Sequence, residues 1–431
     1  MLSYHNMTLG GKKGALLLWL GDLAFFTVAL WLTLLVRYGQ WPSGKIFWLH
    51  LVPFSFIFLV WTVIFFISDL YRRQSMLLAQ SLAPLVLRAQ IINSLIAGLF
   101  FYLIPYFQKI GLTPRLNLLI DLIISFGLIV FWRRSLAPRL WRTRPVPVRF
   151  ECEGAEVAAL KEVIAREPSF NLILTEERPQ LVVYDKYSGD LALKLRDLYR
   201  ALFRGVSFVS VQDLYEEFFG REPLSLLTEQ WFLEQISHRP KVAYDLFKRL
   251  MDLLVAGVLG LVSLVFYPPI ALTIKLTDGG PVFFVDERVG KNGRPIKIYK
   301  FRSMTLEPEL DARQITRVGG WLRRTRLDEL PQLWSVVAGA QSLIGPRPEK
   351  ADYVALYRQE IPFYETRHLI PPGLSGWAQL YQAGHPHFTT SAEATREKLS
   401  YDLYYLKHRS LWLDLAIALK TIKTLVSRRG I

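Results

Sequence analysis

Four long apolar runs in the first third of the chain set the strongest limit on its fold. They cover residues 14–36, 46–67, 91–107 and 116–132 and are rich in Leu, Ile, Phe and Trp. A helix crosses the hydrocarbon core of a bilayer with about 20 mainly apolar residues, because its backbone polar groups pair within the segment. The runs therefore predict a four-helix transmembrane region over residues 1–144.

Charged residues beside and inside these runs predict the topology. Cations are frequent before the first run, after the second and after the fourth: Lys12, Lys13, Arg72, Arg73, Arg133, Arg134, Arg139, Arg142 and Arg144. Since Lys and Arg are enriched in cytoplasmic loops, both ends of the region are expected on the cytoplasmic side. Asp22 and Asp121 lie inside runs, where contacts between bundle helices are favoured over a proton or ion path, because the dense polar series of a transporter is missing.

The overall composition points to anionic partners and to the membrane. The 431 residues carry a formal charge of +15, which suits nucleic acid, phosphate ligands or an anionic membrane face. Half of the residues (51%) are hydrophobic, an unusual share for a wholly soluble protein. The single cysteine, Cys152, excludes an intrachain disulfide framework and a Cys-rich zinc site, and is expected to be a small buried residue.

Residues 145–236 change in character. Short β-branched runs alternate with helical stretches, a pattern that predicts a small parallel, Rossmann-like α/β module. Such folds bind nucleotides through a G-x-G-x-x-G sequence at their first β–α turn. That turn reads CEGAEVA here, with Gly154 as its one glycine, so the phosphate-binding pattern is absent. We expect a regulatory or assembly module rather than a cofactor site.

A fifth apolar stretch, at about residues 243–275, contains the tandem Pro268-Pro269. Adjacent prolines remove backbone donors and clash with preceding carbonyls, so a helix must bend there. Charged residues, among them Lys248 and Lys275, lie at both ends of the stretch. We expect a re-entrant membrane helix that turns at the prolines and leaves on the side where it entered. A kinked full crossing is the alternative, but it would place the basic downstream region outside.

Two adjacent carboxylates, Asp328 and Glu329, lie between leucines in the sequence RRTRLDELPQLW. Thr325, three residues before Asp328, is typical of a capping box, and Pro331 supports a helix start nearby. The positive end of that helix and the upstream arginines are expected to keep both carboxylates ionised and to attract phosphate. An ionised Asp beside a carboxylate that can hold Mg²⁺ suits attack on phosphorus. An acidic pair that only supports the helix dipole is the plainer alternative.

Two further segments suggest ligand or membrane contacts. In LIPPGLSGWAQL the glycines permit close backbone approach to a ligand, and Trp377 and Gln379 are candidates for contact with a base or sugar. Packing alone is the alternative for Trp377. The last helical segment places apolar residues along one face, which indicates a helix that lies at the membrane surface rather than across it, with an amphipathic helix packed on a soluble core as the alternative. These apolar residues are Leu411, Leu415, Leu419, Ile422 and Val426.

Four segments together resemble the monotopic phosphoglycosyl transferases, in the large subgroup of bacterial sugar transferases that prime exopolysaccharide or O-antigen synthesis. They are GGPVFFVDERVGKNGRPIKIYKFRSM, ITRVGGWLRRTRLDELPQLWSVVAGAQSLIGPRP, PPGLSGWAQL and YDLYYLKH, in the family's order and spacing. The resemblance covers about residues 239–431, so an α/β catalytic domain is expected over residues 237–431. The N-terminal runs and the small module look like the large subgroup in architecture only.

The resemblance implies transfer of a sugar-1-phosphate from a UDP-sugar to undecaprenyl phosphate, with release of UMP, at the cytoplasmic face of a bacterial inner membrane. Asp328 would be the nucleophile at the β-phosphorus, and Glu329, with Asp328 beside it, would help to hold Mg²⁺. The other candidates are cations for the phosphate charge, Lys300, Arg302 and Arg323, and residues that match family positions near nucleotide or metal, Arg347 and Asp402.

Other functions remain as alternatives. A catalytically silent membrane scaffold of a polysaccharide assembly is the first, and the intact Asp328, Glu329 and GPRP argue against it. A transporter would be favoured only by the four runs, which contain no evident repeat. Nucleic acid is not expected as a partner, because the cations lie beside membrane runs and phosphate-like sites. The sugar is open, with galactose or glucose preferred, and a homodimer through the cytoplasmic module is expected.

Overall fold

The structure is a computed structural model that describes residues 12–71, 82–103, 114–140, 145–167, 170–236, 241–305, 314–382 and 391–427. Its contacts divide the chain into two units. The first comprises Met1–Tyr184 and Leu195–Val209, and the second comprises Asp185–Lys194 and Ser210–Ile431. The three-part division expected from the sequence, with boundaries at residues 144 and 236, stays a prediction.

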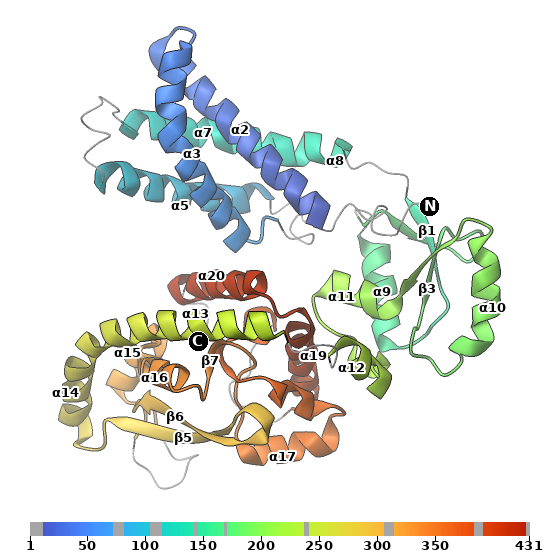
Figure 1. The fold of residues 1–431 in the computed structure, drawn as a ribbon. Helices are drawn as coiled ribbons and strands as arrows, with labels where there is room; N and C mark the ends of the chain where they lie inside the picture. The colour runs from blue at the N-terminus through green and yellow to red at the C-terminus, as the bar shows by residue number, and fades with distance from the viewer. Residues whose placement is uncertain are drawn as a thin grey trace. The chain divides into compact units, whose positions relative to one another are not determined.

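A bundle of four helices forms the larger part of the first unit (Figure 1): α2 (Lys12–Tyr38), α3 (Gly44–Ile67), α5 (Leu82–Leu103) and α7 (Pro114–Phe131). Helix α2 packs against α3 and α7, and α5 packs against the same two helices, so the four close around one core. Phe26, Phe54 and Trp61 are almost fully buried in it. The predicted helices are confirmed, although the third begins earlier than expected, and residues 104–107 lie outside the described residues.

Four helices in the described parts of the chain are long and apolar enough to cross a membrane. They are Gly14–Tyr38, Gly44–Ile67, Leu82–Tyr102 and Val242–Thr277. The first three agree with predicted spans, and the fourth is the stretch predicted to re-enter. Helix α7, which has 18 residues and includes Arg115 and Asp121, is not among them. Its place in the bundle comes from its packing on α2 and α5.

Buried polar groups of the bundle pair across helices. Arg133 lies in a π-helical turn that continues α7, and its Nε donates to Oδ1 of Asp22 in α2 at 3.1 Å. Its NH1 also donates to the carbonyl of Leu70 at 2.6 Å, and Thr33 donates to Asp121 at 3.4 Å. Both acids of the bundle therefore serve contacts between its helices, as predicted. Arg133, by contrast, was expected among the flanking cations and is buried inside the bundle.

The small α/β part consists of β1 (Val146–Phe150), α9 (Ala155–Arg166), β2 (Leu172–Leu174), β3 (Leu181–Tyr184), α10 (Leu191–Leu202) and β4 (Ser207–Ser210). The strand order is β2-β1-β3-β4, and β1 is parallel to both of its neighbours. These elements follow the predicted alternation. Cys152 is partly rather than fully buried, with its Sγ 3.9 Å from the carbonyl of Val183.

The second unit is a mixed α/β domain. Its helices are α11 (Val211–Phe219), α12 (Glu229–Gln235), α13 (Val242–Ser263), α14 (Tyr267–Asp278), α15 (Arg317–Thr325), α16 (Gln332–Val337), α17 (Ala351–Glu360), α18 (Trp377–Tyr381), α19 (Ala392–His408) and α20 (Leu411–Ser427). The hairpin β5 (Phe283–Val289) and β6 (Pro295–Phe301) is antiparallel, and β7 (Ser342–Ile344) and β8 (Gly373–Ser375) are parallel. Trp231 of α12 belongs to the same core as Tyr364 and Leu403, so α12 is part of this domain.

The apolar helix at the start of this domain breaks where the prolines lie. Helix α13 ends at Ser263, a 3-10 turn (Leu264–Phe266) follows, and α14 starts with Pro268 and Pro269 in its first turn. A proline in the first turn loses no helical hydrogen bond, so the pair starts a new helix instead of continuing α13. Figure 1 shows α14 leaving α13 at an angle. The predicted bend is confirmed, and re-entry into one leaflet stays a prediction.

Candidate active site

The carboxylate pair lies in a 3-10 turn, Leu327–Glu329, between α15 and α16. Arg326 has a left-handed backbone (φ 59°) that ends α15 and redirects the chain. Leu327 and Leu330, the leucines on either side of the pair, pack against a buried cluster of the domain. This cluster consists of Ile270, Ile274, Phe301 and Leu322. The leucines thus fix the turn while the carboxylates point elsewhere.

The prediction that Thr325 caps this turn is wrong. Thr325 is the last residue of α15, and its hydroxyl donates back to the carbonyls of Trp321 and Leu322 at 2.9 and 3.1 Å. It therefore ends one helix and does not cap the next, because its hydroxyl is used within its own helix. Pro331 directly precedes α16, as the sequence indicated.

Glu329 is surrounded by cations. Its Oε1 lies 3.3 Å from Lys300 Nζ of β6 and 3.7 Å from Arg326 NH1. Burial alone raises the pKa of this carboxyl, but the charges of Lys300, Arg347 and Arg326 outweigh it, so the pKa is lower than usual. Glu329 is therefore ionised at neutral pH, as expected.

Asp328 differs from its neighbour. It is 7% exposed, and burial together with the charge of Glu329 raises its pKa to about 6, against the opposing charges of Lys300, Arg323 and Arg326. Desolvation of this carboxylate is a larger effect than the attraction of the three cations, so its pKa lies above the usual value. At pH 7 most of the group is still ionised. Its Oδ1 has no hydrogen-bond partner among the described residues, so a buried anionic oxygen is available for a ligand.

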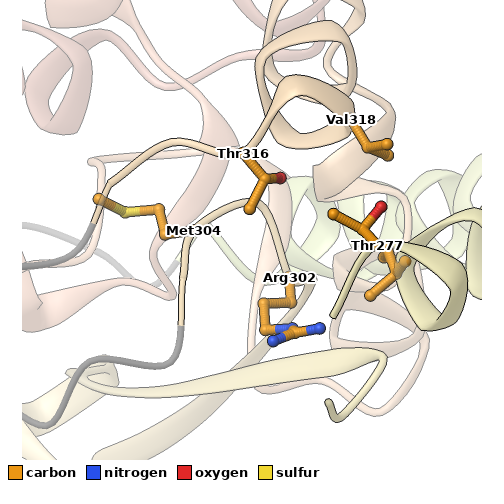
Figure 2. Close-up of a pocket in the computed structure, with 6 residues that line it drawn as sticks. Thr277, Arg302, Met304, Thr316 and Val318 are labelled. Carbon is orange, nitrogen blue, oxygen red and sulfur yellow. The ribbon is translucent and has the colours of Figure 1, made fainter. Parts of the chain in front are cut away.

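Arg302, two residues after Lys300, lines a different feature (Figure 2). It is buried at the edge of a small pocket between α14 and the start of α15. The pocket is lined by Ile274, Thr277, Arg302, Met304, Thr316 and Val318. Figure 2 shows the guanidinium of Arg302 on one side of this pocket, with Thr277 and Thr316 around it. Lys300 thus contacts the dyad directly, whereas Arg302 contributes to the adjoining pocket.

Asp402 is placed in a buried ion pair. Its Oδ2 lies 2.8 Å from NH2 of Arg367, and each side chain is 2% exposed. The same guanidinium donates to the carbonyl of Arg347 at 2.9 Å and to the hydroxyl of Tyr364 at 2.8 Å. Asp402 therefore acts on the GPRP loop through Arg367, while the charge of Arg347 acts on Glu329. Sequence reasoning missed Arg367, because no local pattern marks a lone arginine 35 positions before its partner.

Trp377 and Gln379 are held by packing. The indole N–H of Trp377 donates to the carbonyl of Gly220 at 2.8 Å, and its ring stacks on Tyr404 at 5.3 Å between centroids. With 8% of its surface exposed, this residue fits the packing alternative. The amide of Gln379 lies 3.5 Å from the carbonyl of Leu374. No described contact brings either residue to the carboxylate pair.

The structure thus joins part of the predicted site. Lys300, Arg323 and Arg347 act on the carboxylates Asp328 and Glu329 through contact or charge. Arg326 is an addition to this group, and its position directly before LDEL was the available signal. An oxygen pair with one unpartnered buried atom fits a hard cation such as Mg²⁺, which prefers carboxylate ligands.

Comparisons with known proteins agree with this arrangement. A family described as bacterial sugar transferase matches residues 243–428. An exopolysaccharide production protein of Rhizobium leguminosarum bv. phaseoli is 38% identical over 200 residues, which are 44% of this chain and 96% of that protein. The chain belongs to the bacterial sugar transferase family. The match includes the dyad turn, the hairpin and α13, so these features are those of the family's domain.

Two longer relatives carry specific names. A UDP-N-acetylgalactosamine-undecaprenyl-phosphate N-acetylgalactosaminephosphotransferase of Aeromonas hydrophila is 38% identical over 266 residues, 59% of this chain and 60% of that protein. A UDP-glucose:undecaprenyl-phosphate glucose-1-phosphate transferase of Escherichia coli K12 is 39% identical over 186 residues, 41% of this chain and 39% of that protein. The aligned part of the chain thus spans only part of the length of each of these bacterial sugar transferases.

Proposed function

We propose that this protein transfers a sugar-1-phosphate from a UDP-sugar to undecaprenyl phosphate and releases UMP, as the first membrane step of exopolysaccharide, capsule or O-antigen synthesis. The observation that carries the proposal is the buried, mostly ionised Asp328, whose Oδ1 has no hydrogen-bond partner in the described parts of the chain and which lies among cations. Two named relatives use a UDP-sugar and undecaprenyl phosphate. Because their sugars differ, they leave the sugar of this protein open between hexoses and N-acetylated hexoses.

In the first half-reaction, a carboxylate oxygen of Asp328 attacks the β-phosphorus of the UDP-sugar. A bond forms between that oxygen and the phosphorus, and the bond to the bridging oxygen breaks with its electron pair going to UMP. In the second half-reaction, an oxygen of undecaprenyl phosphate attacks the same phosphorus and returns the carboxylate. The two steps keep two bulky anions from having to react directly.

The residues around Asp328 suit these steps. Lys300, Arg323 and Arg347 provide positive charge for the diphosphate, and Arg302 provides it in the adjoining pocket. Glu329, with Asp328, would hold Mg²⁺, which when bound supplies charge that offsets repulsion between the anions. The raised pKa of Asp328 keeps the group basic enough to be a competent nucleophile while it remains mostly ionised at pH 7.

The domain's apolar surfaces support a location at the membrane. Large exposed apolar side chains follow α13 from Leu246 to Val265, and Leu411, Trp412, Leu415, Ile422 and Leu425 are exposed on α20. A helix that turns at Pro268 and Pro269 would re-enter one leaflet, so that the dyad lies at the cytoplasmic face of the inner membrane, where soluble nucleotide and lipid phosphate meet. A Rossmann-like module without nucleotide and a homodimer through that module are further parts of this proposal.

The test is UMP release from a panel of UDP-sugars by purified protein with undecaprenyl phosphate and Mg²⁺. Asp328→Asn should abolish both turnover and the trapped phosphosugar–protein species, because the amide is not a nucleophile. Glu329→Gln should lower both. Full turnover by Asp328→Asn would refute the nucleophile assignment. A well-folded wild-type protein that releases no UMP from any sugar would instead favour the scaffold alternative.

A further inference from the structure

Arg249 of α13 donates two hydrogen bonds to α16, the helix that follows the carboxylate pair. Its NH1 donates to the carbonyl of Val336 and its NH2 to the carbonyl of Val337, both at 2.7 Å. These carbonyls end α16, where the helix has a partial negative charge, and the carbonyl of Val336 also accepts the backbone N–H of Gly339 at 3.0 Å. A guanidinium fits both acceptors at once because its N–H groups form a rigid fork.

Three more contacts lie on the same face of α13. Oδ1 of Asp252, which is 5% exposed, accepts the backbone N–H of Leu343 in β7 at 3.1 Å. Ala256 is fully buried against Leu333 and Val336 of α16. Gly260 lies against the ring of Trp334, which a Cβ atom there would meet at 3.4 Å. The spacing of 249, 252, 256 and 260 is that of one helical face.

The opposite face of α13 is apolar and uncovered by the described residues. Leu246, Leu250, Leu254, Val258 and Leu261 are between 47% and 66% exposed. A helix with such a face lies in lipid or at its boundary. One side of α13 is therefore suited to contact with the bilayer, and the other side is hydrogen-bonded to α16, the helix that follows the turn of Asp328 and Glu329.

We propose that Arg249, supported by Asp252, is a positioning residue that sets the depth of the Asp328 turn relative to the bilayer and so admits the phosphate of the membrane-borne acceptor. This inference rests on the proposed transfer to a lipid phosphate. Helix α16 is only six residues, about 9 Å, long. Because Arg249 is hydrogen-bonded to the last carbonyls of α16, a displacement of α13 also displaces α16. Pro331 and the preceding turn of Asp328 and Glu329 then move with it.

Separate measurement of the two half-reactions distinguishes this positioning role from a general effect on the stability of the protein. The donor is a soluble nucleotide that reaches Asp328 from water, so release of UMP without acceptor does not depend on depth. The acceptor phosphate is fixed at the membrane surface by its polyprenyl chain, so its attack on the phosphorus depends on the depth of the Asp328 turn. Loss of the charge-assisted hydrogen bonds from Arg249 to the two carbonyls should slow the acceptor step by at least about tenfold.

The experiment uses full-length protein in nanodiscs with undecaprenyl phosphate. In Arg249→Gln, the single-turnover release of UMP without acceptor should keep the wild-type amplitude and rate, while discharge to the lipid slows. Arg249→Lys, which retains the charge and not the fork, should be intermediate. Lys248→Gln is the matched control, because Lys248 is the adjacent cation but pairs with Asp414 of α20 at 3.2 Å. It should behave as wild type in both steps.

The depth of the Asp328 turn in the bilayer is measured separately from the transfer reaction. A fluorophore on Trp321→Cys, in a Cys152→Ser background, reports quenching by lipids that carry a quencher at known depth; Trp321 is 51% exposed on α15. Arg249→Gln should change this quenching, and Lys248→Gln should not. Equal losses in both half-reactions, no loss in either, or unchanged quenching would each overturn the proposal. If the wild type releases no UMP, the transfer reaction fails, and quenching alone decides whether Arg249 sets depth.

Discussion

Asp402→Asn should destabilise the catalytic domain and leave its metal dependence unchanged. Asp402 and Arg367 are 2% exposed and 2.8 Å apart, and Lys398 lies within electrostatic range of the same carboxylate. The substitution keeps the shape of the side chain and removes its charge. Arg367 and Lys398 would then share Glu349 as their anionic partner in this network.

The expected loss in the free energy of unfolding follows from the burial of the Asp402–Arg367 ion pair. At 2.8 Å and an effective dielectric constant of 20, Coulomb's law gives an attraction of about 6 kcal/mol, part of which offsets desolvation of the two charges. Removing one partner of a buried pair costs about 3–5 kcal/mol, because the other charge stays buried. The amide of Asn still accepts a hydrogen bond, so we expect about 3 kcal/mol, which lowers Tm by roughly 6–12 °C for a domain of this size.

Thermal unfolding in detergent, followed by intrinsic fluorescence, measures the loss of stability, and Mg²⁺ titrations of UMP release measure the metal dependence of the folded fraction. Asp245→Asn is the matched control, because its pair with Arg409 at 3.3 Å is about half exposed at the carboxylate and should contribute below about 1 kcal/mol. If Asp402→Asn unfolds at the wild-type temperature but needs far more Mg²⁺, Asp402 belongs to the metal or nucleotide site and the structural role is refuted.

Three further outcomes follow from the same structure. Lys300→Met should raise KM for the UDP-sugar by about tenfold in initial-rate assays, because it removes the cation nearest Glu329, and Lys300→Arg should retain most of the affinity; equal KM values for all three proteins would contradict this. His368 has its pKa lowered to about 3 by burial and two nearby arginines, so below pH 6.5 the unfolded chain binds a proton that the folded protein excludes. Stability should therefore fall by about 1.4 kcal/mol per pH unit as pH drops from 6.5 toward 3, and His368→Gln should flatten that slope in unfolding curves. Lys407→Met should cost about 3 kcal/mol in thermal unfolding, because the mostly buried and ionised Glu216 loses the lysine that it pairs with; adding Glu216→Gln should restore part of the loss, and no recovery would exclude this pairing as the cause.

Much of the fold was predictable because its signals are local. Apolar run length predicted the bundle helices, and alternation of short β-branched runs with helical stretches predicted the strands and helices of the small module. The tandem Pro268-Pro269 predicted the break after α13, because proline acts on its own helix and needs no distant partner. The acidic pair was conspicuous for the same reason, since its leucines, arginines and following proline are all within a few positions.

Other features depended on partners that the local pattern does not name. Trp377 donates to a carbonyl 157 positions earlier, and Arg133 pairs with Asp22 across 111 positions. Thr325 failed as a cap because Arg326 turns left-handed and ends the preceding helix there. Asp402, which the family resemblance places near the nucleotide or metal, pairs with Arg367, a partner that its own motif does not name.

The order of residues alone dictates which stretches are apolar enough for a bilayer, where helices must stop, and which carboxylates stand side by side with cations upstream. The folded structure determines the burial and the neighbouring charges of each ionisable group, and so its pKa. Asp328 and Glu329 are neighbours in the chain, yet burial raises the pKa of one to about 6 while cations from β6 and the GPRP loop lower that of the other. The difference arises because desolvation and Coulomb energies depend on distances in space, and only packing of α13, β6 and α16 brings those groups together.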